Sequence, residues 1–152
     1  MSQRMSNDEL MNFFKKDRFA YNNGIKLIKV EPGFAVAQMT VTENHLNAAN
    51  VVQGGAIFTL ADFAFAAAAN SNGLITLGTN VNISYFKSPK GSILTAKASR
   101  ISSGKRLCFY NVDVFDENED IVAKFTATGY ITSGTIEQLC ECTTDKDAEH
   151  RQ

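Results

Sequence analysis

The fold is decided by a stretch that reads QGGAIFTLADFAFAAAAN, from Gln53 to Asn70. Helical spacing places apolar side chains on nearly every side of it, and a helix of that kind is usually buried. Asp62 is its one charged side chain. A carboxylate in a buried helix is costly to ionise unless something compensates it, so Asp62 is a candidate functional residue. The alternative is that Thr59, Asp62 and Ala66 form a narrow solvated stripe.

Two glycines, Gly54 and Gly55, precede the apolar run. The first amide groups of a helix have no partner within the helix and lie at its positive end. Bare glycine backbone at that position lets a ligand oxygen approach closely. An amide that polarises a carbonyl, on the same rigid helix as a carboxylate, is typical of an acyl-transfer site. Glycine pairs at loop–helix junctions are also common without any such site.

The composition indicates one globular domain. The 152 residues are 44% hydrophobic and 20% charged, and the net charge of −1 offers no field that would attract nucleic acid or a membrane, so neither partner is expected. No apolar run is long enough to span a bilayer, and Met1–Arg4 lacks the apolar core of a signal peptide. Cys108, Cys140 and Cys142 do not make a disulfide framework, which favours a reduced, cytoplasmic setting.

The rest of the chain contains one further helix and six strand-like segments. Ser6 and Glu9 match a capping box at the start of a helix expected over Ser6–Lys16. Alternating apolar side chains predict strands at residues 24–30, 34–41, 77–86, 93–101, 107–115 and 121–131. Short turns join most of these segments, which predicts a mostly antiparallel sheet.

These elements predict an α+β fold in which one curved sheet wraps around the long helix. The exposed outer face and edge of such a sheet favour association with a second copy. We divide the chain into an N-terminal helix and lead-in (residues 1–23), a main domain (24–134) and a polar tail (135–152) that we expect to be disordered.

The run from His45 to Asp62 resembles the signature of hotdog-fold acyl-CoA thioesterases, in particular of the phenylacetate-degradation branch. The similarity continues through Asn70–Gly73, Asn82–Pro89 and Gly104-Lys105, so it covers roughly residues 24–130. Its specific part is the spacing from asparagine to the glycine pair and on to Leu-Ala-Asp. The resemblance implies a hotdog fold, a dimer with two active sites at the subunit interface, and the common pairing of such dimers into tetramers.

The resemblance also implies roles for individual residues. Asp62 would be the nucleophile or general base, the Gly54 amide would polarise the thioester carbonyl, and Asn47 would position the carbonyl or the attacking water. A strand hydroxyl near Thr79 would assist, although a register error of one residue would reverse its face. Gly55 and Phe58 are the expected substrate contacts beside these groups.

The chain departs from the family pattern at Gln53, where a histidine usually precedes the two glycines. Glutamine can form hydrogen bonds but cannot titrate near neutral pH. If the family's histidine only orients the loop or the carbonyl, Gln53 can therefore replace it. If the histidine transfers a proton, this protein is slow or uses other chemistry. His45 does not have the matching spacing, and a polar loop residue without a role is the remaining interpretation of Gln53.

Four basic residues and three aromatic residues are candidates for the substrate. Lys87, Lys90, Lys105 and Arg106 lie in or beside turns, where they either meet the phosphates of CoA or are simply solvated. Phe58, Phe63 and Phe65 lie near Asp62 and suit an aromatic or medium-chain acyl group, or they belong to the core.

Three functions remain open on the sequence. The first is hydrolysis of an acyl-CoA thioester without a metal or other cofactor, since the chain has no cluster of metal ligands. The second is an acyl-CoA-binding or sensing protein on the same fold, in which Gln53 marks lost activity. Retention of Asp62 favours the enzyme. A hotdog dehydratase is a weaker third hypothesis, because the histidine expected near the helix is absent.

Overall fold

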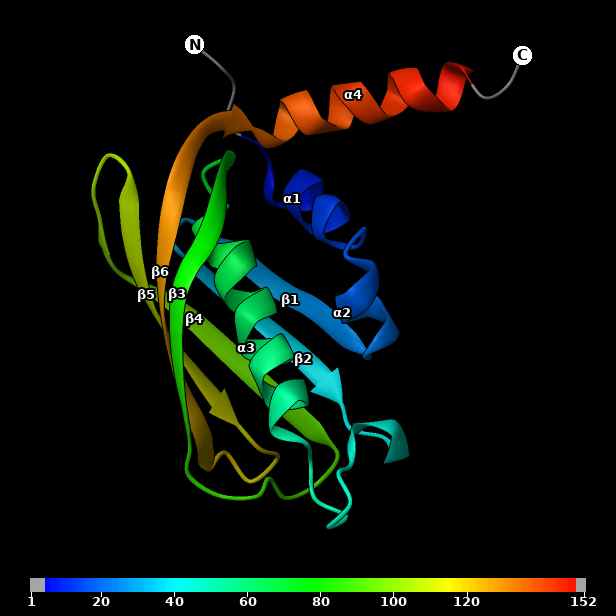
Figure 1. The fold of residues 1–152 in the computed structure, drawn as a ribbon, viewed down its shortest axis with the longest axis vertical. Helices are drawn as coiled ribbons and strands as arrows, with labels where there is room; N and C mark the ends of the chain where they lie inside the picture. Colours follow the sequence, from blue (N-terminus) through cyan, green and yellow to red (C-terminus); the bar gives the residue numbers. More distant parts are fainter. Residues whose placement is uncertain (1–4, 150–152) are drawn as a thin grey trace.

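The computed structural model describes residues 5–149, and side chains as far as residue 142. Figure 1 shows its elements, which are α1 (Asn7–Phe14), α2 (Arg18–Asn22), β1 (Ile25–Glu31), β2 (Phe34–Thr40), the short 3-10 helix η1 (Glu43–His45), α3 (Gly54–Ala69), β3 (Leu74–Tyr85), β4 (Ile93–Ser103), β5 (Leu107–Phe115), β6 (Ile121–Thr135) and α4 (Ile136–Glu149). The six strands form one antiparallel sheet in the order β1-β2-β4-β5-β6-β3.

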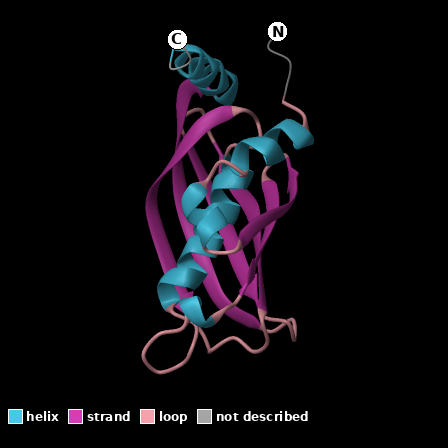
Figure 2. Cartoon of the chain, turned by 90° about the vertical axis from the view of Figure 1, so that its right-hand side faces the viewer, coloured by secondary structure: helices cyan, strands magenta, loops and turns pink. Residues whose placement is uncertain are grey.

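The long helix α3 lies across the concave face of this curved sheet (Figure 2). Alternation along β2 turns Ala35, Ala37 and Met39 inward, where each is fully buried. Ala96 and Ala98 of β4 are fully buried in the same core. Because alanine side chains are short, the helix packs closely on these strands. The α+β arrangement predicted from the sequence, one sheet wrapped around one helix, is therefore confirmed.

Polar side chains fix the end of α3 against the sheet. The Asn70 amide donates to the carbonyl oxygens of Ala66 (2.8 Å) and Thr76 (3.2 Å), and its Oδ1 accepts from the Thr76 N–H at 2.8 Å. The Ser71 hydroxyl oxygen accepts from the Gly33 N–H at 2.8 Å. These contacts fix the position of the C-terminal end of α3 on the sheet. The packing of α3 in the core then fixes the direction of its N-terminus.

The structure differs from the sequence prediction in two helices. The five-residue helix α2, capped by the Asp17 side chain, was not expected. The segment expected to be disordered forms α4, because Ile136 is fully buried with Leu10 and Val30 in a second small core. Residues 150–152 of the predicted tail lie outside the described residues. No helix within residues 5–149 is long and apolar enough to cross a membrane.

Candidate active site

The N-terminus of α3 presents an unpaired amide. Gln53 is the N-cap, and its Oε1 accepts a hydrogen bond from the Gly55 N–H. The Gly54 N–H finds no acceptor among the described residues. Since it lies at the positive end of a sixteen-residue helix, it is available to an electronegative ligand atom. Gln53 thus supports the helix start through a hydrogen bond, and its predicted role in place of the histidine stays a prediction.

Tyr85, at the end of β3, covers this helix start. Its hydroxyl donates to the Gly54 carbonyl oxygen at 2.9 Å. A Cβ added at Gly54 would lie 3.1 Å from Cζ and 3.2 Å from the hydroxyl oxygen of Tyr85. The approach of this ring therefore explains why residue 54 is a glycine. Burial raises the pKa of Tyr85, so the hydroxyl remains a neutral donor.

Asp62 lies two turns further along α3 and is half-buried. Thr59 and Ala66 are also half-buried, so the narrow stripe considered as an alternative exists. Burial raises the pKa of Asp62, and the negative charge of Asp17 raises it further. Among the described residues, no hydrogen bond or ion pair compensates the carboxylate. An accessible, uncompensated carboxylate with a raised pKa is a candidate general base.

Asp62 and the Gly54 amide of one chain do not form one site. They are eight residues apart on the same helix, which separates them by about 12 Å along its axis. A base and an oxyanion donor must each lie within about 3 Å of atoms of one reacting group. One chain therefore carries both a candidate base and a candidate oxyanion donor, but they are too far apart to act on the same substrate.

The loop before α3 is held together by Asn47. Its Oδ1 accepts from the N–H groups of Ala49 (2.9 Å) and Val51 (3.3 Å), and its own N–H donates to the Val51 carbonyl oxygen at 2.8 Å. Asn47 is exposed, and a contact with a ligand falls to its Nδ2 because Oδ1 is occupied. The predicted role in positioning a ligand stays a prediction, now restricted to that donor.

His45 is a structural residue. It is buried, its Nδ1 accepts from the Thr42 N–H at 2.9 Å, and its Nε2 lies 2.8 Å from the Asn23 carbonyl oxygen. The carbonyl partner assigns the proton to Nε2. Both ring nitrogens are occupied in linking the end of α2 to the loop, so His45 does not replace the missing histidine.

Thr79 lies in a bulge of β3, and Phe58 lies at the edge of the core. Thr79 is the extra residue of a bulge between Gly78 and Asn80, and its hydroxyl donates to the Thr128 carbonyl oxygen at 3.2 Å. Phe58 is half-buried against Phe125, with ring centroids 5.4 Å apart.

Phe63 and Phe65 are buried core residues. Phe63 packs on Phe14, with ring centroids 5.9 Å apart, and Phe65 packs on Tyr110 at 5.6 Å. Their interpretation as core side chains is therefore the one that the packing supports.

The four basic candidates separate into two pairs. Lys87 and Lys90 lie in the β3–β4 loop, and Lys87 lines, together with Gly54 and Tyr85, a shallow pocket of about 320 Å³. Lys87 forms an ion pair with Asp120 at 2.6 Å. Lys105 and Arg106 lie in the β4–β5 turn at the opposite end of the molecule (Figure 1). Within one chain, Lys87 therefore neighbours the N-terminus of α3, and Lys90 lies further along the same loop.

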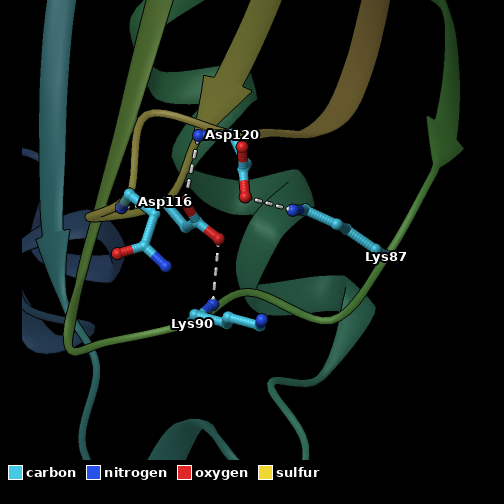
Figure 3. A network of polar contacts seen from close by, with 5 residues as sticks. Lys87, Lys90, Asp116 and Asp120 are labelled. Carbon is cyan, nitrogen blue, oxygen red and sulfur yellow. Dashed lines mark hydrogen bonds and ion pairs between the residues drawn. The ribbon is translucent and has the colours of Figure 1, made fainter.

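Figure 3 shows how the β3–β4 loop is fixed to the β5–β6 turn. Asp116 is almost fully buried, and its Oδ2 accepts from the Lys90 N–H at 3.1 Å. Its Oδ1 accepts from the N–H groups of Asn118 (3.0 Å) and Asp120 (3.1 Å). Burial opposes the charge on Asp116, but these bonds and the Lys87 cation outweigh burial and lower its pKa.

Comparison with known proteins assigns the family. A sequence model of the thioesterase superfamily matches residues 49–123. Acyl-coenzyme A thioesterase PaaI of Escherichia coli K12 is 36% identical over 124 residues, which cover 81% of this chain and 89% of that protein. The chain belongs to the thioesterase superfamily. The solved E. coli PaaI protein of the phenylacetic acid degradation operon superposes with a TM-score of 0.78 at 34% identity, over 82% of this chain and 91% of that one.

A second solved structure carries a ligand. A hypothetical thioesterase of Streptococcus pneumoniae TIGR4, solved with coenzyme A, has a TM-score of 0.75 at 28% identity over 82% of this chain and 98% of that one. The predicted resemblance is thereby confirmed, and the chain is a PaaI-like hotdog protein.

Two residues beside the candidate site were not singled out from the sequence. Tyr85 stood in the quoted strand, but its contact with Gly54 spans 31 positions and leaves no local signal. Asp17 acts on Asp62 through space from α2. Among the described residues, no group of three or more histidine, cysteine, aspartate or glutamate side chains is placed to hold a metal ion.

Proposed function

We propose that this protein hydrolyses acyl-CoA thioesters to a carboxylic acid and CoA. The observation that carries the proposal is the uncompensated Asp62 carboxylate with its raised pKa, in a chain that belongs to the thioesterase superfamily. A carboxylate whose pKa is raised toward the working pH is a better base than an ordinary aspartate.

In the proposed reaction Asp62 takes a proton from a water molecule, whose oxygen forms a bond with the thioester carbonyl carbon. The Gly54 N–H donates to the carbonyl oxygen as negative charge develops there. The carbon–sulfur bond then breaks, and the proton passes to the departing CoA sulfur. Asn47 orients the water or the carbonyl through Nδ2, and Gln53 holds the helix start in place. No metal or other cofactor is required.

We further propose that each site is shared by two subunits. The roughly 12 Å between Asp62 and Gly54 on one helix supports this, because a partner's helix start can bring the missing amide to the carboxylate. The outer edge of β3, which pairs with no other described strand, is the edge on which a second copy would add. In such a dimer, Lys105 and Arg106 would join Lys87 and Lys90 around CoA phosphates.

We also propose the class of acyl group, the assembly into a tetramer and the cellular location. Phe58 and the small residues of the α3 stripe support an aromatic or medium-chain acyl group. Exposed apolar side chains on the outer face, Ile101, Leu107, Phe109 and Tyr130, support pairing of dimers into a tetramer. The absence of a disulfide among the described cysteines supports a cytoplasmic location.

A panel of acetyl-, octanoyl-, decanoyl- and phenylacetyl-CoA, assayed by release of free thiol, tests the proposal. We expect turnover of at least one thioester by the natural protein and its loss in Asp62→Asn. Asp8→Asn, which alters an exposed carboxylate on α1, is the matched control and should keep full turnover. Binding of these thioesters without thiol release would instead identify an acyl-CoA-binding protein, the second hypothesis from the sequence.

A further inference from the structure

Two adjoining cavities lie at the N-terminal helices, one between these helices and the body of the domain and the other formed by residues 15–22 alone. One, of about 340 Å³, has largely apolar walls that include Met11 and Phe14 of α1, Leu27 of β1 and Phe63 of α3. The other, of about 450 Å³, is lined by Lys15, Lys16, Arg18, Tyr21 and Asn22. Lys15 and Tyr21 line both cavities, so an apolar chamber opens directly beside a cationic one.

The cations around the second cavity are not neutralised by the protein. Lys15, Lys16 and Arg18 are exposed, and none forms an ion pair with a residue that the structure describes. The one carboxylate in these walls is Asp17, whose Oδ1 is engaged with the Ala20 N–H at 3.0 Å as the N-cap of α2. With Lys26 in the wall of the first cavity, four cations and one carboxylate leave a local positive charge on a chain whose net charge is −1.

We propose that the two cavities together bind an amphipathic carboxylate. The apolar tail lies along the wall that Met11, Phe14 and Leu27 form, and the carboxylate lies at Lys15 and Arg18. Sites for small molecules are concave, mostly apolar and provided with a few polar groups that fix the ligand, which is the combination present here. A guanidinium and an ammonium are the strongest partners for a carboxylate.

Different observations support the amphipathic character of this ligand and the choice of a carboxylate as its head group. The apolar walls and the cationic rim select an amphipathic anion. The choice of a carboxylate rests on the proposed function, because thioester hydrolysis releases carboxylic acids. Phe63 directly follows Asp62 on α3, so the acid would bind against the helical turn that carries the catalytic candidate. The site is nevertheless distinct from the helix start at Gly54, whose pocket shares no lining residue with either cavity.

Isothermal titration of the full-length protein with decanoate and with decanol tests the head group. We expect decanoate to bind more tightly than decanol, and the double substitution Lys15→Glu and Arg18→Glu to weaken decanoate about tenfold or more while leaving decanol unchanged. Lys97→Glu, an exposed lysine of β4 that lines neither cavity, is the matched control and should bind decanoate as the natural protein does.

Filling the apolar cavity tests the tail. Met11 is half-buried in its wall, and Met11→Trp should abolish binding of both ligands, with the fold checked by thermal unfolding. No heat or chemical-shift change with millimolar decanoate, or equal binding after the double charge reversal, would overturn the inference. Inhibition of decanoate binding by CoA alone would also overturn it, since the cationic cavity would then hold CoA phosphates.

The same titrations separate this inference from the proposed function. Asp62→Asn should bind decanoate as the natural protein does, because Asp62 lines neither cavity. Thioester hydrolysis without decanoate binding would refute only the inference. Decanoate binding without hydrolysis of any thioester would refute only the proposed function.

Discussion

At the scale of the residue, Asp62 combines a functional position with a thermodynamic cost. We expect Asp62→Asn to lower turnover by about 10²- to 10⁴-fold, the usual contribution of a positioned acid–base group. Its folded-state pKa is raised, so ionisation of Asp62 destabilises the fold at neutral pH, and this effect vanishes below its unfolded pKa. The variant should therefore be at least as stable as the natural protein in urea at pH 7. Turnover near the natural level would remove Asp62 from the mechanism.

Asp17 offers a test of the electrostatic cause. Its negative charge helps to raise the pKa of Asp62. Asp17→Asn removes the charge and keeps an amide oxygen that can still cap α2, because asparagine is as good an N-cap as aspartate. We expect the acid limb of the pH dependence of kcat/KM to move to lower pH, since Asp62 then loses its proton more easily. An unmoved limb in Asp17→Asn would mean that a group other than Asp62 controls it.

Two substitutions of Gly54 separate the effect of its N–H group from the effect of adding a side chain. Gly54→Pro deletes the N–H at the first helical position, where proline is tolerated, and the extended backbone of Gln53 (ψ 134°) suits a following proline. Gly54→Ala adds a Cβ in the same contact with Tyr85 and keeps the N–H. We expect the proline variant to be about 10²- to 10³-fold slower than the alanine variant, the usual loss for one oxyanion donor. Equal rates would show that this amide does not contact the carbonyl.

At the scale of the element, the β3–β4 loop is positioned by a carboxylate that belongs to another turn. Asp116 uses both oxygens as acceptors, whereas asparagine has only one. Asp116→Asn should release the loop and lower kcat/KM about tenfold, within the roughly 10²-fold that a misplacement of about 1 Å can cost. Asp120→Asn, which removes only an exposed ion pair with Lys87, should cost less in the same assay. An equal loss in both variants would attribute the effect to the ion pair.

The periodic pattern of apolar residues was sufficient to predict the long secondary-structure elements. The strands and α3 carry regular alternation or an apolar surface over seven residues or more, and the structure contains each of them. Strand β3 begins at Leu74 and not at residue 77, and β6 ends at Thr135 and not at residue 131. The five-residue helix α2 is too short to show a period. Helix α4 is itself a polar segment, and among its described side chains, residues 136–142, only Ile136 is buried. One buried residue in a polar run is not a pattern that a sequence displays.

The sequence indicated the residue types of the candidate site but not the surroundings of these residues. The motif with Asn47, Gly54 and Asp62 is local, and α3 and the loop before it bring these residues to the accessible side of the core. The bulge at Thr79 changes the alternation of β3, and the neighbouring Gly78 does not indicate which residue is the extra one. The effect of Asp17 on Asp62 depends on how α2 packs, which no spacing in the sequence specifies.

At the scale of the whole molecule, the proposed mechanism needs a second copy, and the outer edge of β3 pairs with no other described strand. Antiparallel addition of a second copy along β3 would continue the sheet and satisfy its free backbone groups. A two-fold axis makes two equivalent sites, each with Asp62 from one subunit and the Gly54 amide from the other. We therefore expect sedimentation at micromolar concentration to show at least a dimer.

Mixing two inactive variants tests whether subunits share the site. Asp62→Asn keeps the amide and Gly54→Pro keeps the carboxylate, so a mixed dimer has one site with both groups intact and one with neither. Random exchange after joint refolding should therefore restore about one quarter of the natural activity, since half of the dimers are mixed and half of their sites are intact. If both groups act within one chain, every chain carries a lesion and the mixture stays as inactive as its components. Recovery in the mixture, with none after mixing either variant with itself, distinguishes the two arrangements.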